Sequence, residues 1–414
     1  MNIVTRPTQN SRCIYLCFKW IYTILYYTGC LCFQLRGETF QLTKANIIYT
    51  QFIRASLLFG FLCSMLLKCS GNEGSKAMLE RLSPVLKLIL ALECFTSAMT
   101  YIATCLAMQW NRHKHLQLTQ QFKALDAQMQ IDFNYIKWNY HKTMRKFTPF
   151  TLFGMAYYYI VSFIYLFKLS NCNCDYITTF VLALSYSSIT IAPSCIFFLH
   201  LGKMDLLRIR YRLIKRLLQQ QYALATHSKE QHKLELRISR LIDYCKSYIQ
   251  LILQINDVFG AVCGISLFHD FAVLTNMTFL MCQKATEANT SVEEYLFIFL
   301  FMLPRIYKVI IYAVYGYVTL KEQRRCTHEA SMCEKYLTCA SATRNKLAAF
   351  LHWQMQNTYS LLVGKVTRCN LILLYTTVNS IASSVVILIQ LQFQQNSISN
   401  RMKNKEMLHD VELL

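Results

Sequence analysis

Long apolar runs alternate with polar, basic segments along this chain. Seven of the runs are long enough for a helix that crosses a bilayer, which needs roughly 20 apolar residues. Hydrophobic residues make up 54% of the chain and charged residues only 16%, which excludes an ordinary soluble domain. The pattern therefore predicts an all-α polytopic membrane protein with spans near 47–68, 84–108, 147–168, 175–200, 255–282, 295–320 and 371–394.

An eighth apolar run, at about 13–33, has a different character. It carries Lys19 near its middle, and aromatic residues such as Trp20 and Tyr22 are frequent in it. It either spans the membrane or lies in the interface as an amphipathic or re-entrant helix. The hydropathy pattern leaves both alternatives open.

The positive charge is distributed unevenly between the loops. If the N-terminus is cytoplasmic and the chain crosses seven times, 31 of the 43 Lys and Arg residues fall in inner segments. The positive-inside rule therefore predicts an inner N-terminus and an outer C-terminus. The net charge of +21 then reflects topology, and we expect no nucleic-acid partner. Asn289 begins an Asn-Thr-Ser sequon in an outer loop and is a predicted glycosylation site.

The inner segments are expected to be helical extensions of the spans. No proline or glycine occurs between Met204 and Asn256, and apolar residues keep helical spacing there. Such helices bury their apolar faces against a neighbouring subunit, within one subunit, or on the inner leaflet. The predicted division is a cytoplasmic N-terminus (1–46), spans one to four with a cytoplasmic helical loop at 109–146 (47–200), cytoplasmic helices (201–254), spans five and six (255–320), a cytoplasmic anchor segment (321–370), a last span (371–394) and an extracellular tail (395–414).

The last span carries a stripe of small polar residues and no charge. Its polar members recur at steps of three, four and seven, so they share one helix face. Ile387 interrupts the stripe, as in a water-filled pore with a hydrophobic constriction. The alternative is a helix packed in a bundle, whose hydroxyl groups bond locally or to a neighbouring helix. The predicted pore residues are Thr376, Ser380, Ser383, Ile387, Gln390 and Gln394.

Charged residues inside spans are costly and mark a second candidate site. Asp270 in the fifth span and Arg305 in the sixth are expected to pair, for structural reasons or because they line a ligand cavity. Glu93 and Arg54 are expected to reach an interface instead. Aromatic and small polar residues in the outer halves of spans three to six suit a cavity for a small, partly apolar ligand. The predicted lining is Tyr158, Ser162, Tyr165, Tyr186, Phe268, His269, Phe271, Thr275 and Arg305.

Other classes of function fit less well. There is no glycine-rich phosphate loop, zincin helix or nucleophile elbow, so no enzyme, metal site or cofactor is predicted. A G-protein-coupled-type receptor would have an outer N-terminus, against the charge distribution. A membrane transporter would be expected to show internal repeats, which are not evident here.

Two short motifs resemble those of insect gustatory receptors. Gly364, Asn370 and an apolar stretch ending at Gln390 match the C-terminal signature of that family, with Ser383-Ser384 in place of Thr-Tyr and Leu391 in place of Phe. Near the N-terminus, Leu25-Tyr26-Tyr27-Thr28-Gly29 resembles the family's Leu-Tyr-x-x-Gly segment. The order and sizes of the loops agree over almost the whole chain.

This resemblance implies a fold and a function. It implies seven spans, with a first apolar run that does not cross and cytoplasmic helices that form a central anchor. It also implies a tetrameric, ligand-gated, non-selective cation channel in which Ile387 forms the gate and Gln390 the polar ring outside it. A small-molecule tastant, of the bitter type by the family's habits, would bind the outer pocket. The expected partners are membrane lipid and further copies or related subunits, and the expected location is the plasma membrane of gustatory neuron dendrites.

Overall fold

The protein is almost entirely helical. The computed structural model describes residues 16–36, 39–70, 84–136, 138, 140–169, 176–225, 231–286, 292–337, 341–357, 359–364 and 367–412. The helices are η2 (Leu16–Phe18), α1 (Lys19–Tyr27), α2 (Lys44–Ser70), α4 (Pro84–Trp110), α5 (Arg112–Asp132), α6 (Tyr140–Leu169), α7 (Tyr176–Ala225), α8 (Gln231–Thr286), α9 (Val292–Met332), η3 (Cys333–Tyr336), α10 (Ala342–Gln356) and α11 (Leu371–Glu412). Two short antiparallel hairpins pair β1 (Gln34–Arg36) with β2 (Thr39–Gln41) and β3 (Leu362–Val363) with β4 (Thr367–Arg368).

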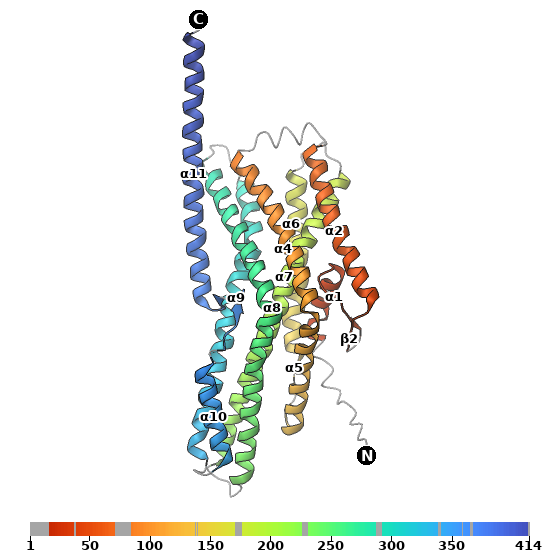
Figure 1. The fold of residues 1–414 in the computed structure, drawn as a ribbon, viewed down its shortest axis with the longest axis vertical. Helices are drawn as coiled ribbons and strands as arrows, with labels where there is room; N and C mark the ends of the chain where they lie inside the picture. The colour runs from red at the N-terminus through yellow and green to blue at the C-terminus, as the bar shows by residue number, and fades with distance from the viewer. Residues whose placement is uncertain are drawn as a thin grey trace.

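The predicted spans all fall in long helices. Among the described residues, six helices are long and apolar enough to cross a membrane, namely α2, α4, α7, α8, α9 and α11. The predicted run at 147–168 lies in α6, a helix of 30 residues that packs along α7 but is not among those six. The chain is therefore an all-helical polytopic membrane protein. In Figure 1 these helices form one bundle, with α11 along its side and extending beyond it.

Three helices are much longer than a bilayer is thick. Helices α7, α8 and α9 contain 50, 56 and 41 residues. At about 1.5 Å per residue, each exceeds the roughly 30 Å hydrocarbon core. Their excess length, with α5 and α10, forms the lower half of the bundle in Figure 1. The absence of proline and glycine between Met204 and Asn256 explains why α7 and α8 continue so far.

A buried ion pair joins four elements in this lower half. Asp126 of α5 binds Arg210 of α7, and both side chains are at most 2% exposed. Tyr140 of α6 and Tyr248 of α8 each donate a hydrogen bond to the Asp126 carboxylate at 2.7 Å. The Arg210 guanidinium also stacks 4.6 Å from the Trp138 ring. Because every charge has partners, the desolvation cost of burying the pair is offset.

The first apolar run folds as a short helix inside the protein. Helix α1 contains only nine residues, far fewer than a bilayer crossing requires. Its Tyr22 hydroxyl hydrogen-bonds His115 Nε2 of α5 at 3.0 Å. Ile21 and Leu25 are buried, while Trp20 is 47% exposed. The described part of this run therefore forms a helix too short to span a bilayer, and its apolar face packs against protein.

Candidate functional site

The polar stripe of α11 faces away from the rest of the chain. Helix α11 contacts α8 and α9, and Leu374 and Ile381 pack against their apolar side chains. At about 100° per residue, the stripe lies on the opposite side of the helix from Leu374 and Ile381. Ile387 is 55% exposed. The remaining stripe residues, Thr376, Ser380, Ser383, Gln390 and Gln394, are all exposed as well.

Apolar residues flank this stripe. Tyr375, Val386 and Phe393 are 68%, 53% and 68% exposed, and helical spacing places them on one side of it. Within the described residues, the Thr376 hydroxyl bonds back to Leu373 O at 3.0 Å, which is an ordinary local contact. Exposed amides and hydroxyls beside apolar flanks are unsuited to a surface that is wholly in lipid. The arrangement suits a helix whose stripe meets water.

A buried polar cluster lies between α4, α7, α8 and α9. The His269 ring hydrogen-bonds Ser97 Oγ at 2.9 Å, and Tyr186 donates to Glu93 Oε1 at 2.9 Å. Lys308 contacts both Asp270 Oδ2 and Ser266 Oγ at 2.6 Å. We call this set the buried polar cluster: Glu93, Ser97, Tyr186, Ser266, His269, Asp270, Arg305 and Lys308.

The cluster corrects the predicted ion pair. Asp270 pairs with Lys308, not with Arg305. Arg305 is fully buried and donates from Nη1 to Phe301 O at 2.9 Å, with its guanidinium 4.1 Å from the Phe301 ring. Among the described residues, its Nε and Nη2 have no hydrogen-bond partner. Both basic residues lie on α9 less than one turn apart, about 60° from each other around the helix axis.

The predicted ligand-lining residues do not all lie at the cluster. Tyr158, Tyr186 and Asp270 lie within Coulombic reach of Arg305, so α6, α7 and α8 converge on one place. Phe271 is half-buried, and the buried Thr275 hydroxyl has no hydrogen-bond partner among the described residues. Phe268 is 67% exposed and points away from the cluster. The side chains of Ser162 and Tyr165, and the whole of Asn289, lie outside the described residues.

Sequence reasoning did not assign Glu93, Ser97 or Ser266 to this cluster. Glu93 was expected to reach an interface but is only 5% exposed, and Ser97 is 2% exposed. They lie one turn apart on α4, so a polar pair at helical spacing inside an apolar run was the available signal. Arg54 is also buried, at 6% exposed, and donates to Gly29 O at 2.6 Å.

The segment before α11 is fastened to α8 and α9 by close backbone contacts. At the tip of the β3–β4 hairpin, Gly364 has a φ of +60° and donates its N–H to Gly260 O at 2.8 Å. A Cβ on Gly264 would lie 2.7 Å from the Gly364 Cα. A Cβ on Gly316 of α9 would lie 2.4 Å from Cys369 O. Glycine at 264 and 316 is thus what lets this segment approach both helices.

Asn256 of α8 holds the same segment through its side chain. Its Nδ2 donates to Ser360 O at 2.8 Å, and its Oδ1 accepts from Leu362 N at 3.0 Å. On the α9 side, Cys369 Sγ donates to Tyr312 O at 3.2 Å. The start of α11 is therefore linked to α8 and α9, which also carry five of the eight residues of the buried polar cluster.

Known proteins share both the sequence pattern and the fold. Residues 18–395 match the model of a family described as 7tm chemosensory receptor. The candidate gustatory receptor 47b of Drosophila melanogaster is 31% identical over 388 residues, covering 93% of this chain and 92% of its own. The candidate gustatory receptor 57a of the same species is 27% identical over 364 residues, covering 84% of each chain.

The fold has counterparts of solved structure. The olfactory receptor OR5 of Machilis hrabei in complex with eugenol superposes with a TM-score of 0.62 at 11% identity, over 92% of this chain and all of that one. A second structure of the same receptor gives a TM-score of 0.60 at 12% identity, again over 92% of this chain. The chain therefore belongs to the 7tm chemosensory receptor family and is an insect gustatory-type receptor, not an enzyme.

Proposed function

We propose that this chain is one subunit of a tetrameric, ligand-gated cation channel that opens when a small-molecule tastant binds. Its N-terminus is cytoplasmic, it crosses the plasma membrane seven times with α6 as the third span, and its C-terminus is outside. The lower halves of α7–α9, with α10, form the cytoplasmic anchor around which subunits assemble, either as one kind of chain or with related receptors. Dendrites of gustatory neurons are the proposed location.

The single observation that carries the channel proposal is the orientation of the α11 stripe. The stripe lies on the side of α11 opposite to its contacts with α8 and α9, and Ile387 at its centre is 55% exposed. Four copies around an axis would place these hydroxyls and amides against water and the apolar flanks against one another. Ile387 is then the constriction, which closes by dewetting, and Gln390 is the polar ring beside it.

The buried polar cluster is the proposed ligand site. It combines Arg305 donors that have no hydrogen-bond partner among the described residues, a hydrogen-bonding pair at His269 and Ser97, and aromatic side chains of α6 and α7. Small-molecule sites are mostly apolar with a few polar groups that converge on one place. The structural neighbour OR5 is solved with eugenol, a small molecule, which supports a ligand of similar size here.

The hairpin contacts supply the connection between ligand and pore. Asp270 and Gly264 lie on α8 less than two turns apart, and Gly264 touches the hairpin tip beside α11. A ligand that favours one rotation of α8 and α9 would therefore move the start of α11. Such coupling requires only that the ligand bind the two arrangements with different affinity.

Whole-cell currents from cells that express only this chain test the proposal. A panel of sugars, amino acids and bitter compounds should evoke cation current, and Ile387→Ala should add a leak in the absence of any compound. Gln390→Ala should change the relative permeability to Na⁺ and K⁺. Val378→Ala is the matched control, because Val378 is 56% exposed but lies off the stripe. Unchanged currents in both stripe variants, with normal surface expression, would show that α11 does not line the pore.

A further inference from the structure

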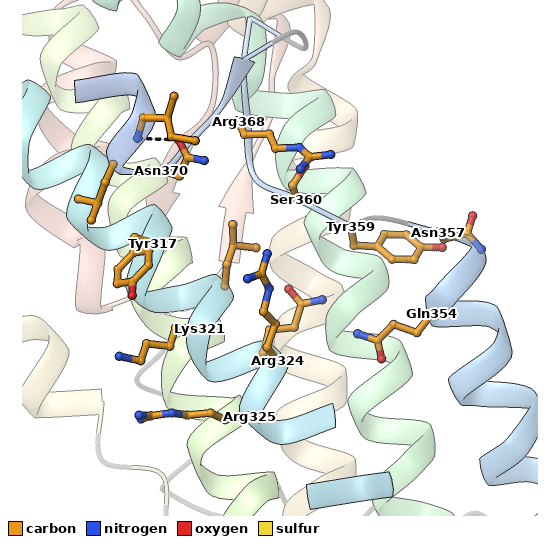
Figure 2. A pocket seen from close by; sticks show the side chains of 14 residues that line it. Tyr317, Lys321, Arg324, Arg325, Gln354, Asn357, Tyr359, Ser360, Arg368 and Asn370 are labelled. Atoms are coloured by element: carbon orange, nitrogen blue, oxygen red, sulfur yellow. Dashed lines mark hydrogen bonds between the residues drawn. The ribbon is translucent and has the colours of Figure 1, made fainter. Parts of the chain in front are cut away.

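A second cavity lies at the inner end of α11, away from the buried polar cluster. Its volume is about 530 Å³, and its walls come from the lower part of α9, the end of α10, the β3–β4 hairpin and the first residues of α11. Figure 2 shows these elements around the opening, with Arg324 and Gln354 between α9 and α10 and Arg368 above them. The site described above uses none of these residues.

The walls of this cavity are basic. Lys321, Arg324, Arg325 and Arg368 line it, and no acidic residue is among the residues that line it. Arg325 has one weak acidic contact, to Glu322 at 3.6 Å. Within the described part of the chain, Lys321, Arg324 and Arg368 form no ion pair. Lys321, Arg324 and Arg325 share one face of α9, because helical residues three and four apart are neighbours.

An apolar wall adjoins these cations. Leu371 begins α11 and is 45% exposed, and Tyr317 is 42% exposed one turn above Lys321. A soluble anion would need no such wall. A phosphorylated lipid uses both the cations and the apolar wall, since its phosphates contact the cations while its chains cover the apolar side chains.

We propose that this cavity binds the head group of a multiply phosphorylated inositol lipid from the inner leaflet. The proposal rests on the orientation given above, which places the start of α11 at the cytoplasmic face. Arginine forms paired hydrogen bonds to phosphate oxygens, and a cluster of three arginines and one lysine matches a head group with several phosphates. Contact between copies at this cavity would crowd like charges, so the subunit contacts of the proposed anchor would use other faces of α7–α10.

The site has a consequence for gating. The bound lipid touches α9, the hairpin and the start of α11 together, and these are the elements that link the buried polar cluster to the pore. It therefore stabilises whichever arrangement of these elements closes the cavity around the head group. Depletion of the lipid would change the ligand-evoked current without any change in the ligand site.

Binding is measured on the purified full chain, without any tastant. Delipidated protein is titrated with dioctanoyl phosphatidylinositol 4,5-bisphosphate, and bound lipid is counted by native mass spectrometry. The variant Lys321→Gln, Arg324→Gln, Arg368→Gln should bind it on the order of 100-fold more weakly, at roughly a tenfold loss or less for each cation. The control Arg216→Gln, Lys233→Gln, Arg237→Gln removes three exposed cations elsewhere on α7 and α8 and should bind as the unchanged chain does.

Each other outcome overturns a stated part of the proposal. Equal binding by both variants would place the lipid elsewhere. If inositol 1,4,5-trisphosphate binds as tightly as the lipid and displaces it, the cavity is a site for soluble phosphates. If dioctanoyl phosphatidylserine binds with equal affinity, the cavity has no preference for a head group with several phosphates. An altered subunit number with intact lipid binding would assign the cavity to a contact between copies. This experiment measures lipid binding and no current. A failure of the lipid proposal is therefore distinguishable from a failure of the channel proposal.

Discussion

Gly264 of α8 and Gly364 at the hairpin tip lie so close that a Cβ on Gly264 would be 2.7 Å from the Gly364 Cα. Real Cβ atoms do not approach backbone atoms this closely, so any larger residue at position 264 forces the hairpin to shift. The sequence motif around Gly364 therefore has a physical cause. Glycine at 364 supplies the φ of +60°, and glycine at 264 supplies the space.

Gly264→Ala is predicted to weaken both stability and the coupling of ligand to pore. Overpacking of this kind costs about 1–3 kcal/mol, and the displaced hairpin no longer holds α11 in register. The measurements are the melting temperature of the purified protein and the ligand-evoked current per surface receptor. Gly154→Ala is the control, because nothing lies within 4 Å of a Cβ there. Equal behaviour of the two variants would contradict a tight contact at the hairpin.

The pair between Lys308 and Asp270 is predicted to behave as a unit. Lys308→Met leaves a buried carboxylate without its cation and should cost about 3–5 kcal/mol. The exchange Asp270→Lys with Lys308→Asp should recover most of that loss, measured as surface expression and melting temperature. The exchange Asp270→Arg with Arg305→Asp should not. If only the second exchange recovers surface expression and melting temperature, Arg305 and not Lys308 is the partner of Asp270.

Sequence reasoning found the elements of this site better than their contacts. The α11 stripe was predictable because one helix face follows from residue spacing alone. The partner of Asp270 was not, because Arg305 and Lys308 both lie on the same side of α9 and differ by about 4.5 Å in depth. Phe268 was misplaced for a similar reason, since it neighbours His269 in sequence but points about 100° away around the helix.

The helices and strands of the fold were also predicted only in part. Helices α7 and α8 were predicted to extend beyond the membrane, because no proline or glycine lies between Met204 and Asn256. The end of α11 was not predicted, since the apolar signal ends near 394 while the helix continues to Glu412. The hairpin β3–β4 escaped prediction as well, because strands of two residues leave no pattern and are held by contacts to Asn256 and Gly260.

The ion pair between Asp126 and Arg210 is predicted to be a main source of stability in the lower half of the bundle. Asp126→Asn leaves the Arg210 charge buried and uncompensated, at a cost of about 3–5 kcal/mol. Asp243→Asn is the control, because the Asp243 side chain in its pair with Lys346 is 56% exposed and exposed pairs contribute about 1 kcal/mol or less. Chemical or thermal unfolding of the purified chain measures both. Similar losses in the two variants would show that the buried pair has no special role.

Protonation of His115 is predicted to loosen the contact between α1 and α5. Burial, with a smaller contribution from the nearby Lys203 ammonium, lowers the pKa of His115 from 6.5 to about 3. Its neutral form is therefore favoured in the folded state, so the stability it provides is complete above about pH 6.5 and declines as the pH falls toward 3. Melting temperatures between pH 5 and 8 should fall less steeply for His115→Gln than for the unchanged chain. Identical slopes would mean that His115 does not titrate on unfolding.

Accessibility of cysteines placed along α11 tests most directly whether the stripe lines an ion path. Ser380→Cys, Ser383→Cys and Gln390→Cys should each allow a charged methanethiosulfonate reagent to block the open-channel current, because their side chains would face the water column. Val378→Cys and Val386→Cys, which are 56% and 53% exposed but lie off the stripe, should not. Block at the two valine positions with none at the three stripe positions would contradict a pore lined by this face of α11.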